Sequence, residues 1–176
     1  MGFGKKALQK SVAGISLFAC AILILFWAVA ARRPATRQEK ISKEIGIDVS
    51  GGTEISSYDT HGGNGDGASC VALSFSGDEV LRQIETDQRW KKLPADRTVE
   101  ALIYGISDET SIIGPFLSNQ NGKKLIPRIQ NGYYLFIDRY RDAEKDQDIL
   151  ERKSYNFTAA FYDADNRILY FGKLDT

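Results

Sequence analysis

The chain has 176 residues, with 23 basic and 23 acidic side chains, one histidine and two cysteines. This length suits one domain with an appendage, and 43% hydrophobic and 26% charged residues are typical of a folded protein. A formal net charge of zero is unlike the basic excess of nucleic-acid-binding proteins. Two cysteines exclude a disulfide-rich scaffold, and one histidine excludes a multi-histidine metal centre. We therefore expect no nucleic-acid partner and no cofactor.

The first segment predicts a membrane anchor. Residues 12–31 (VAGISLFACAILILFWAVAA) carry no charge, and a helix of this length covers about 30 Å, the hydrocarbon thickness of a bilayer. A basic tail over 1–11 precedes the run, and Arg32 and Arg33 close it. Trp27 lies near one end, where an aromatic ring suits the depth of the lipid head groups. We expect a single-pass helix in the plasma membrane, with lipid as its partner.

Two alternatives concern the fate and direction of this helix. Ala28, Val29 and Ala30 form an A-x-A triplet, so cleavage after Ala30 would release a secreted domain. The run is longer than the usual signal core of about 7–15 residues, which favours an uncleaved signal-anchor. Charge counting on the two flanks leans slightly toward a cytoplasmic domain, but a short basic tail before an apolar run is typical of an exported domain. We expect the C-terminal domain outside the cytoplasm.

The sequence after the anchor predicts a stalk and then a folded domain. Residues 32–43 are polar and mixed in charge, which predicts a stalk, and 44–176 predict one compact domain. Apolar side chains alternate with polar or small ones over 45–50, the period-two pattern of a half-buried strand. The pair 51–52 is Gly-Gly, which predicts a hairpin turn with the returning strand over 53–58.

The middle of the domain predicts a strand and one clear helix. Alternation over 71–75 predicts the strand. Ser76 and Glu79 form a capping box before an apolar stripe at helical spacing, which predicts a helix to about Gln88. A second short helix is expected to end near Tyr104, although a strand fits those residues nearly as well.

The last third of the chain predicts antiparallel strands. The aromatic run 133–137 is typical of a central strand covered on both faces. The charged segment 141–153 suits a solvated helix or a loop. Strands over 157–161 and 168–171, joined by an Asp-rich turn at 163–166, predict a terminal hairpin. The fold class is therefore α+β, a mainly antiparallel sheet with one or two covering helices, preceded by a single N-terminal transmembrane helix.

Three segments resemble a family of small uncharacterised proteins of Gram-positive bacteria. They are DTHGGNGDG over 59–67, NGYYLFIDR over 131–139 and NFTAAFYDADNRILYF over 156–171. Members of this family are membrane-anchored or lipid-anchored domains with no assigned activity. The resemblance therefore implies one domain after an anchor and no catalytic residue. Asn64 stands where relatives often carry an aromatic residue after the HGG.

The glycine-rich segment 59–67 is the most unusual part of the chain. Its four glycines allow close backbone approach, so its amides could hold an anion, and its acids with His61 could instead face a cation. A loop in which glycines supply the turns and aspartates cap their own backbone is the favoured interpretation. The G-x-G-x-x-G spacing is not met, and a strand follows, unlike a dinucleotide or P-loop site. The candidate ligand-binding residues are Asp59, His61, Gly63, Gly65, Asp66 and Arg139.

Three functions remain open from the sequence. The favoured one is a membrane protein presenting a binding domain that performs no chemistry. The second is a hydrolase-type enzyme in which Asp59 or Asp66 orients His61 as a general base, with Cys70 or a serine as nucleophile. A cleft joining His61 to Arg139 or Cys70 would favour that enzyme, although Cys70 inside a strand pattern is expected to be a small buried hydrophobe. The third is a structural subunit that docks on a larger membrane complex through exposed aromatic side chains.

Overall fold

The computed structural model describes residues 33–107, 112–140 and 148–176. The transmembrane helix predicted over 12–31 lies outside these residues, and so does the cleavage site considered at Ala30. Contacts divide the chain into two compact units, Met1–Thr36 and Arg37–Thr176, and the second carries every helix and strand given below. Within the described ranges, the helices are too short or too polar to cross a bilayer.

The described residues form three α-helices, one 3₁₀ turn and eight strands. The helical elements are α2 (Arg37–Ile45), α3 (Glu79–Thr86), α4 (Arg97–Tyr104) and the 3₁₀ turn η2 (Ile149–Glu151). The strands are β1 (Thr53–Asp59), β2 (Gly67–Ser74), β3 (Lys91–Lys92), β4 (Ile106–Ser107), β5 (Ile112–Ile113), β6 (Gly132–Asp138), β7 (Asn156–Asp163) and β8 (Ile168–Asp175).

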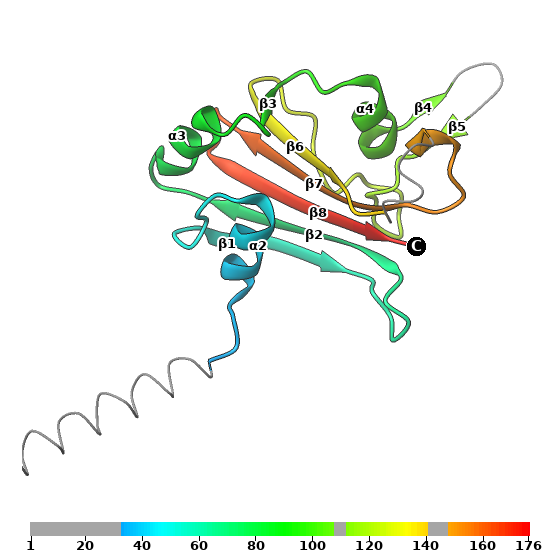
Figure 1. Cartoon of the computed structure of the whole chain (residues 1–176), viewed down its shortest axis with the longest axis horizontal. Coiled ribbons are helices and arrows are strands. Elements are labelled where there is room, and N and C mark those ends of the chain that lie inside the picture. The colour runs from blue at the N-terminus through cyan, green and yellow to red at the C-terminus, as the bar shows by residue number, and fades with distance from the viewer. Residues whose placement is uncertain (1–32, 108–111, 141–147) are drawn as a thin grey trace, which may run out of the picture. The chain divides into compact units, whose positions relative to one another are not determined.

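One six-stranded sheet organises the domain, in the order β1-β2-β8-β7-β6-β3 (Figure 1). Every pairing in it is antiparallel, and β4 and β5 form a separate two-stranded pair. The predicted α+β class with a mainly antiparallel sheet is confirmed, and so are the aromatic strand β6 and the terminal hairpin β7–β8. Three helices are present in the described residues, rather than the one or two expected.

Both faces of the sheet are covered over its inner strands, which makes three layers, whereas most residues of the edge strand β1 are exposed. Alternate residues of a strand point to opposite faces. On β7, Phe157 and Phe161 join the apolar cluster under α4, whereas Ala160 and Tyr162 join the cluster under α2 and α3. Because β7 lies between two long strands and is covered on both faces, nearly all of its side chains are buried.

Helix α2 occupies most of the segment expected to be a stalk, so that expectation for 32–43 is wrong for its helical part. Ile41 and Ile45 lie four positions apart and therefore share one face of a helix, and both are buried in the apolar cluster under α2 and α3. The helix ends where Gly46 takes a φ of 77°, and its N–H donates to the carbonyl of Ser42 at 2.8 Å. The burial of these two isoleucines holds the helix on the domain, although most of its other residues are polar.

The strand predicted over 45–50 is also absent from the structure, although the predicted alternation of burial is correct. Ile47 and Val49 are buried, with exposed residues between them. The N–H of Gly52 donates to the carbonyl of Val49 at 3.0 Å, which closes a turn rather than a hairpin. The segment 46–52 leads from α2 into β1 and does not pair with it. β1 pairs with β2 instead.

The expected cap of α3 differs from the observed one. Asp78 is the N-cap residue, and its carboxylate makes no cap hydrogen bond. It accepts from Nε of Arg167 at 2.7 Å instead, so the capping box predicted for Ser76 is wrong. The segment before Tyr104 is a helix and not a strand, because the carboxylate of Asp96 accepts from the amide of Val99 at 3.0 Å and begins α4.

Replacing Ile45 with alanine tests whether α2 belongs to the domain. Ile45→Ala is expected to lower the free energy of unfolding by about 2–5 kcal/mol, because it leaves a cavity under α2. Urea denaturation followed by circular dichroism measures the change. Lys43→Ala on the exposed side of the same helix is the control and is expected to change it by less than about 0.5 kcal/mol. Equal effects of the two substitutions would contradict the packing of α2.

Candidate functional site

The glycine-rich segment is the loop that joins β1 to β2. Thr60 fixes its base, since its N–H donates to the carbonyl of Ala68 at 3.0 Å and its hydroxyl accepts from the amide of Ala68 at 2.9 Å. Within the loop, the amide of Gly62 donates to the carbonyl of Asp66, and the amide of Gly65 donates to the carbonyl of Gly62. These amides are therefore used by the loop itself rather than aimed at an anion.

His61 connects this loop to the end of β8. Its Nδ1 lies 2.6 Å from Oδ1 of Asp59, and its Nε2 lies 3.2 Å from Oδ2 of Asp175. Asp175 in turn receives two parallel bonds from Arg139, of 2.8 Å to Oδ1 and 3.0 Å to Oδ2. Asp59, His61, Asp175 and Arg139 form a continuous chain of contacting polar side chains, named the ion network below.

Strand register explains why these residues meet. Gly67 opens β2 and lies opposite Asp175 on β8. A Cβ on Gly67 would lie 2.6 Å from backbone atoms of His61, so only glycine lets the loop fold back this closely. The loop thereby carries His61 to the end of β8. On the other side, Arg139 directly follows β6 and reaches the same end.

Hydrogen bonding stabilises the charged form of both acids in the ion network. The backbone amide of His61 lowers the pKa of Asp59, and its ring adds to the effect. Partial burial acts to raise the pKa of Asp175, but the hydrogen bonds and positive charge of Arg139, together with the hydrogen bond from His61, outweigh it and leave the pKa below its ordinary value of 3.8.

The ion network does not have the geometry of a hydrolytic site. Both ring nitrogens of His61 face carboxylates, and neither bonds to a hydroxyl or thiol of the described residues that could act as a nucleophile. Asp66 does not orient His61, because it accepts from the side chain of Asn64 at 2.9 Å. Cys70 is buried on the α4 face, as expected, and burial raises the pKa of its thiol to about 12.

The structure thus brings together some of the predicted site residues. Asp59, His61 and Arg139 join through Asp175, which sequence analysis missed. The loop glycines and Asp66 stay outside this network. In the part of the chain that the structure describes, no group of three or more His, Cys, Asp or Glu side chains is arranged to hold a metal ion. The one available signal for Asp175 was its place on the terminal strand, in alternation with Lys173.

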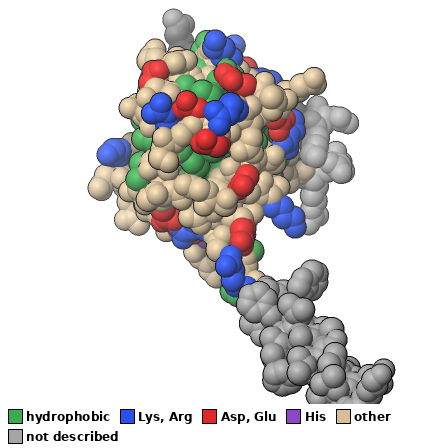
Figure 2. All heavy atoms as spheres, turned by 90° about the vertical axis from the view of Figure 1, so that its left-hand side faces the viewer, with side chains coloured by type: hydrophobic (Ala, Val, Ile, Leu, Met, Phe, Trp, Pro, Cys, Tyr) green, Lys and Arg blue, Asp and Glu red, His purple; other side chains and the backbone are tan. Residues whose placement is uncertain are grey.

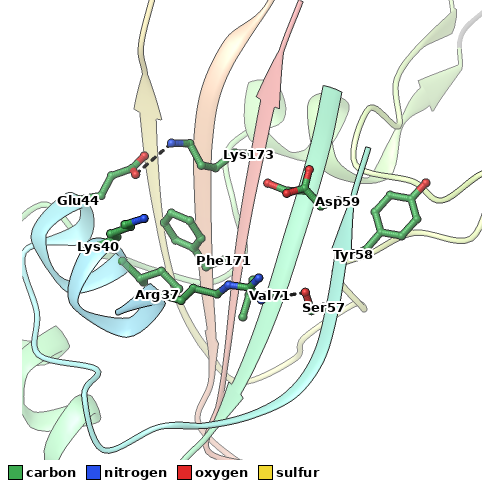
Figure 3. Close-up of a pocket in the computed structure, with 11 residues that line it drawn as sticks. Arg37, Lys40, Glu44, Ser57, Tyr58, Asp59, Val71, Phe171 and Lys173 are labelled. Atoms are coloured by element: carbon green, nitrogen blue, oxygen red, sulfur yellow. Dashed lines mark hydrogen bonds and ion pairs between the residues drawn. The ribbon is translucent and has the colours of Figure 1, made fainter. Parts of the chain in front are cut away.

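A pocket of about 270 Å³ lies on the sheet face beside α2 (Figure 3). Its lining residues come from α2, β1, β2 and β8, and they are Arg37, Lys40, Ile41, Glu44, Ser57, Tyr58, Asp59, Ser69, Val71, Phe171 and Lys173. Asp59 belongs to both the pocket and the ion network, whereas His61 and Arg139 do not line the pocket. The pocket is therefore no cleft joining His61 to Arg139 or Cys70.

Arg37 closes one side of the pocket. It reaches across from α2 toward β1, where its Nη1 donates to the hydroxyl of Ser57 at 2.9 Å and to Glu54 at 3.0 Å (Figure 3). Lys173 pairs with Glu44 at 3.2 Å on the opposite side. The floor is apolar, since the buried side chains of Val71 and Phe171 face this side of the sheet.

Outside the pocket, charges on the domain are mixed. Figure 2 shows one face on which Lys and Arg side chains alternate with Asp and Glu side chains around small hydrophobic areas. Most tyrosine and phenylalanine rings of the described residues are buried or partly buried in the two apolar clusters. Of the large hydrophobic side chains in the described ranges, Ile55 and Ile112 are the exposed ones.

Comparisons of the chain with protein-family models, with curated proteins and with solved structures find no match. The resemblance to anchored proteins of Gram-positive bacteria therefore stays a prediction. Function has to be argued from the chemistry of the pocket and the ion network.

Replacing Asp175 with asparagine tests the ion network through its pH dependence. Near neutral pH, Asp175→Asn is expected to lower the free energy of unfolding by about 1–3 kcal/mol, because Arg139 and His61 lose a charged partner. Since the pKa of Asp175 is lowered by folding, this stabilisation is present above its ordinary value of 3.8 and is lost as the pH falls through the lower folded value. The stabilities of wild type and variant should converge in acid.

Denaturation over a series of pH values measures this difference. Asp66→Asn is the matched control, because it removes the same charge from an exposed position of the β1–β2 loop, outside the ion network, and it should cost less than about 0.5 kcal/mol. A difference for Asp175→Asn that does not depend on pH would contradict the role of the charge.

Proposed function

We propose that this chain is a single-pass membrane protein that presents its Arg37–Thr176 domain outside the cytoplasm as a binding module, with the pocket beside α2 as the ligand site. The observation that carries the proposal is the lining of the pocket. An apolar floor lies beneath Lys40, a cationic side chain that no described residue pairs with. Binding sites combine an apolar surface with a few placed polar groups in this way.

The anchor part of the proposal is supported by the sequence. Twenty uncharged residues over 12–31 match the thickness of a bilayer, and helix α2 begins six residues after them. The domain has its own apolar core on both faces of the sheet, so it can fold without support from the membrane segment.

Binding is favoured over hydrolysis by the state of the reactive groups. His61 has carboxylates at both ring nitrogens, and Cys70 is buried on the face opposite the pocket. Docking through an aromatic patch is not favoured, because most rings of the described residues are buried or partly buried, and the exposed Ile55 and Ile112 lie in different sheets.

Membrane attachment and sidedness are tested together in a bacterial host. We expect the full chain to stay in the membrane pellet after carbonate extraction and a deletion of residues 1–31 to release it. Alkaline phosphatase, which is active only after export, should be active when fused after Thr176. A cytoplasmic reporter such as green fluorescent protein at the same position is the control. Release of the full chain by carbonate, or an inactive phosphatase fusion, would contradict the membrane part of the proposal.

Filling the pocket tests the ligand site. Ser69 lies between Asp59 and Lys173 in the sheet, so Ser69→Trp should fill the space beside α2. In a thermal-shift panel of small carboxylates, amines, alcohols and sugars, at least one class should raise the melting temperature of the wild type and not that of Ser69→Trp. Ligand at about a hundredfold excess over its Kd contributes about 2.7 kcal/mol.

The control for the bulky substitution is Ser56→Trp, at an exposed position of β1 outside the pocket, which should keep the ligand effect. If no class of compound stabilises the wild type, or if Ser69→Trp responds as the wild type does, the pocket is not the ligand site.

A further inference from the structure

We propose that the ligand of the pocket beside α2 is a small carboxylate that carries an apolar group. This inference rests on the proposed function, because it names the ligand class of the same site. It follows from three properties of the lining: each acid already accepts hydrogen bonds from within the domain, Lys40 has no partner among the described residues, and the floor is apolar.

The acidic side chains of the pocket already have positive or donating partners. Glu44 accepts from the ammonium of Lys173 at 3.2 Å and from the hydroxyl of Thr158. Asp59 accepts from the ring and the backbone amide of His61. A cationic ligand would have to compete with these internal partners, and it would also lie beside Lys40.

The cationic side chains keep unused donors. Lys40 has no partner among the described residues, and its ammonium carries three N–H groups. Arg37 uses only Nη1 in its bonds to Glu54 and Ser57, so Nη2 and Nε stay available at the side of the pocket. Figure 3 shows the Arg37 side chain extended between α2 and β1 at this position. Lys40 and Arg37 thus offer donors at the pocket that no described residue uses, and this favours a ligand that accepts hydrogen bonds.

The amount of charge favours a monoanion. Of the three cationic side chains that line the pocket, Arg37 pairs with Glu54 and Lys173 with Glu44, which leaves Lys40 as the cation without a partner among the described residues. A phosphate or a diphosphate would bring more negative charge and would place it near Glu44 and Asp59, at a cost from like-charge repulsion. A single carboxylate meets Lys40 without such an excess.

The floor and the volume define the rest of the ligand. Ile41, Val71 and Phe171 supply apolar surface at the base of the pocket. A volume of about 270 Å³ is just below the usual range of about 300–1,000 Å³ for drug-sized ligands. The ligand is therefore small, with its apolar group on the floor and its carboxylate at Lys40 and Arg37.

Calorimetry on the purified full chain with three probes of equal chain length tests the ligand class. Hexanoate should bind at least about tenfold more tightly than hexylamine or hexan-1-ol, because only the carboxylate meets the free cation. Lys40→Gln should weaken hexanoate binding about tenfold and leave hexan-1-ol unaffected. Lys40→Arg should restore most of the affinity. Lys43→Gln, which removes the same charge from α2 outside the pocket, should have no effect.

Several results would overturn the assignment. They are equal or tighter binding of hexylamine or hexan-1-ol, equal effects of Lys40→Gln and Lys43→Gln, and no binding of any of the three probes. The thermal-shift panel with Ser69→Trp separates these failures from failure of the ligand site itself. If another compound class responds there, the pocket stands and only the carboxylate is wrong. Unchanged circular dichroism and denaturation midpoints of the Lys40 variants show that the change in affinity is local.

Discussion

Burial of one antiparallel sheet on both faces is the constraint on which the domain depends. Strand β7 shows it most clearly, because Phe157 and Phe161 face α4 while Tyr162 faces the opposite layer. Each face needs a cover of its own. Helices α2 and α3 provide one, and α4 with the segment after it provides the other. Between α2 and β1, the sheet face stays open and forms the pocket. The candidate ligand site is thus a consequence of how α2 covers the sheet.

The ion network and the pocket are separate features of the sheet that share one residue, Asp59. The network holds the β1–β2 loop against the ends of β6 and β8 through His61, Asp175 and Arg139. Its side chains bond one another from three elements, although Nε of Arg139 is buried without a hydrogen-bond partner among the described residues. Asp59 belongs to both features, which ties the position of the loop to the pocket beside α2.

Sequence patterns predicted the strands well where period-two alternation covered long segments. The aromatic strand β6 and the hairpin β7–β8 were correct because their side chains alternate between two apolar layers. The pattern misled over 45–50, where Ile47 and Val49 alternate in burial without a neighbouring strand. It also missed α2, because Ile41 and Ile45 alone mark its buried face among polar residues. Two apolar residues are enough to hold this helix in place, because they pack against the apolar face of the sheet.

By itself, the sequence determined the α+β class, the position of most long strands along the chain and the burial of Cys70, since these depend on local composition and spacing. It also singled out Asp59, His61 and Arg139 by their chemistry. Only the tertiary structure decided what these residues meet. Asp175 lies far from His61 along the chain. The register of β2 and β8 brings Nε2 of His61 within 3.2 Å of Oδ2 of Asp175. Lys40 lies over an apolar floor because Ile41 and Ile45 pack α2 onto the sheet, and only the folded domain shows which strands they meet.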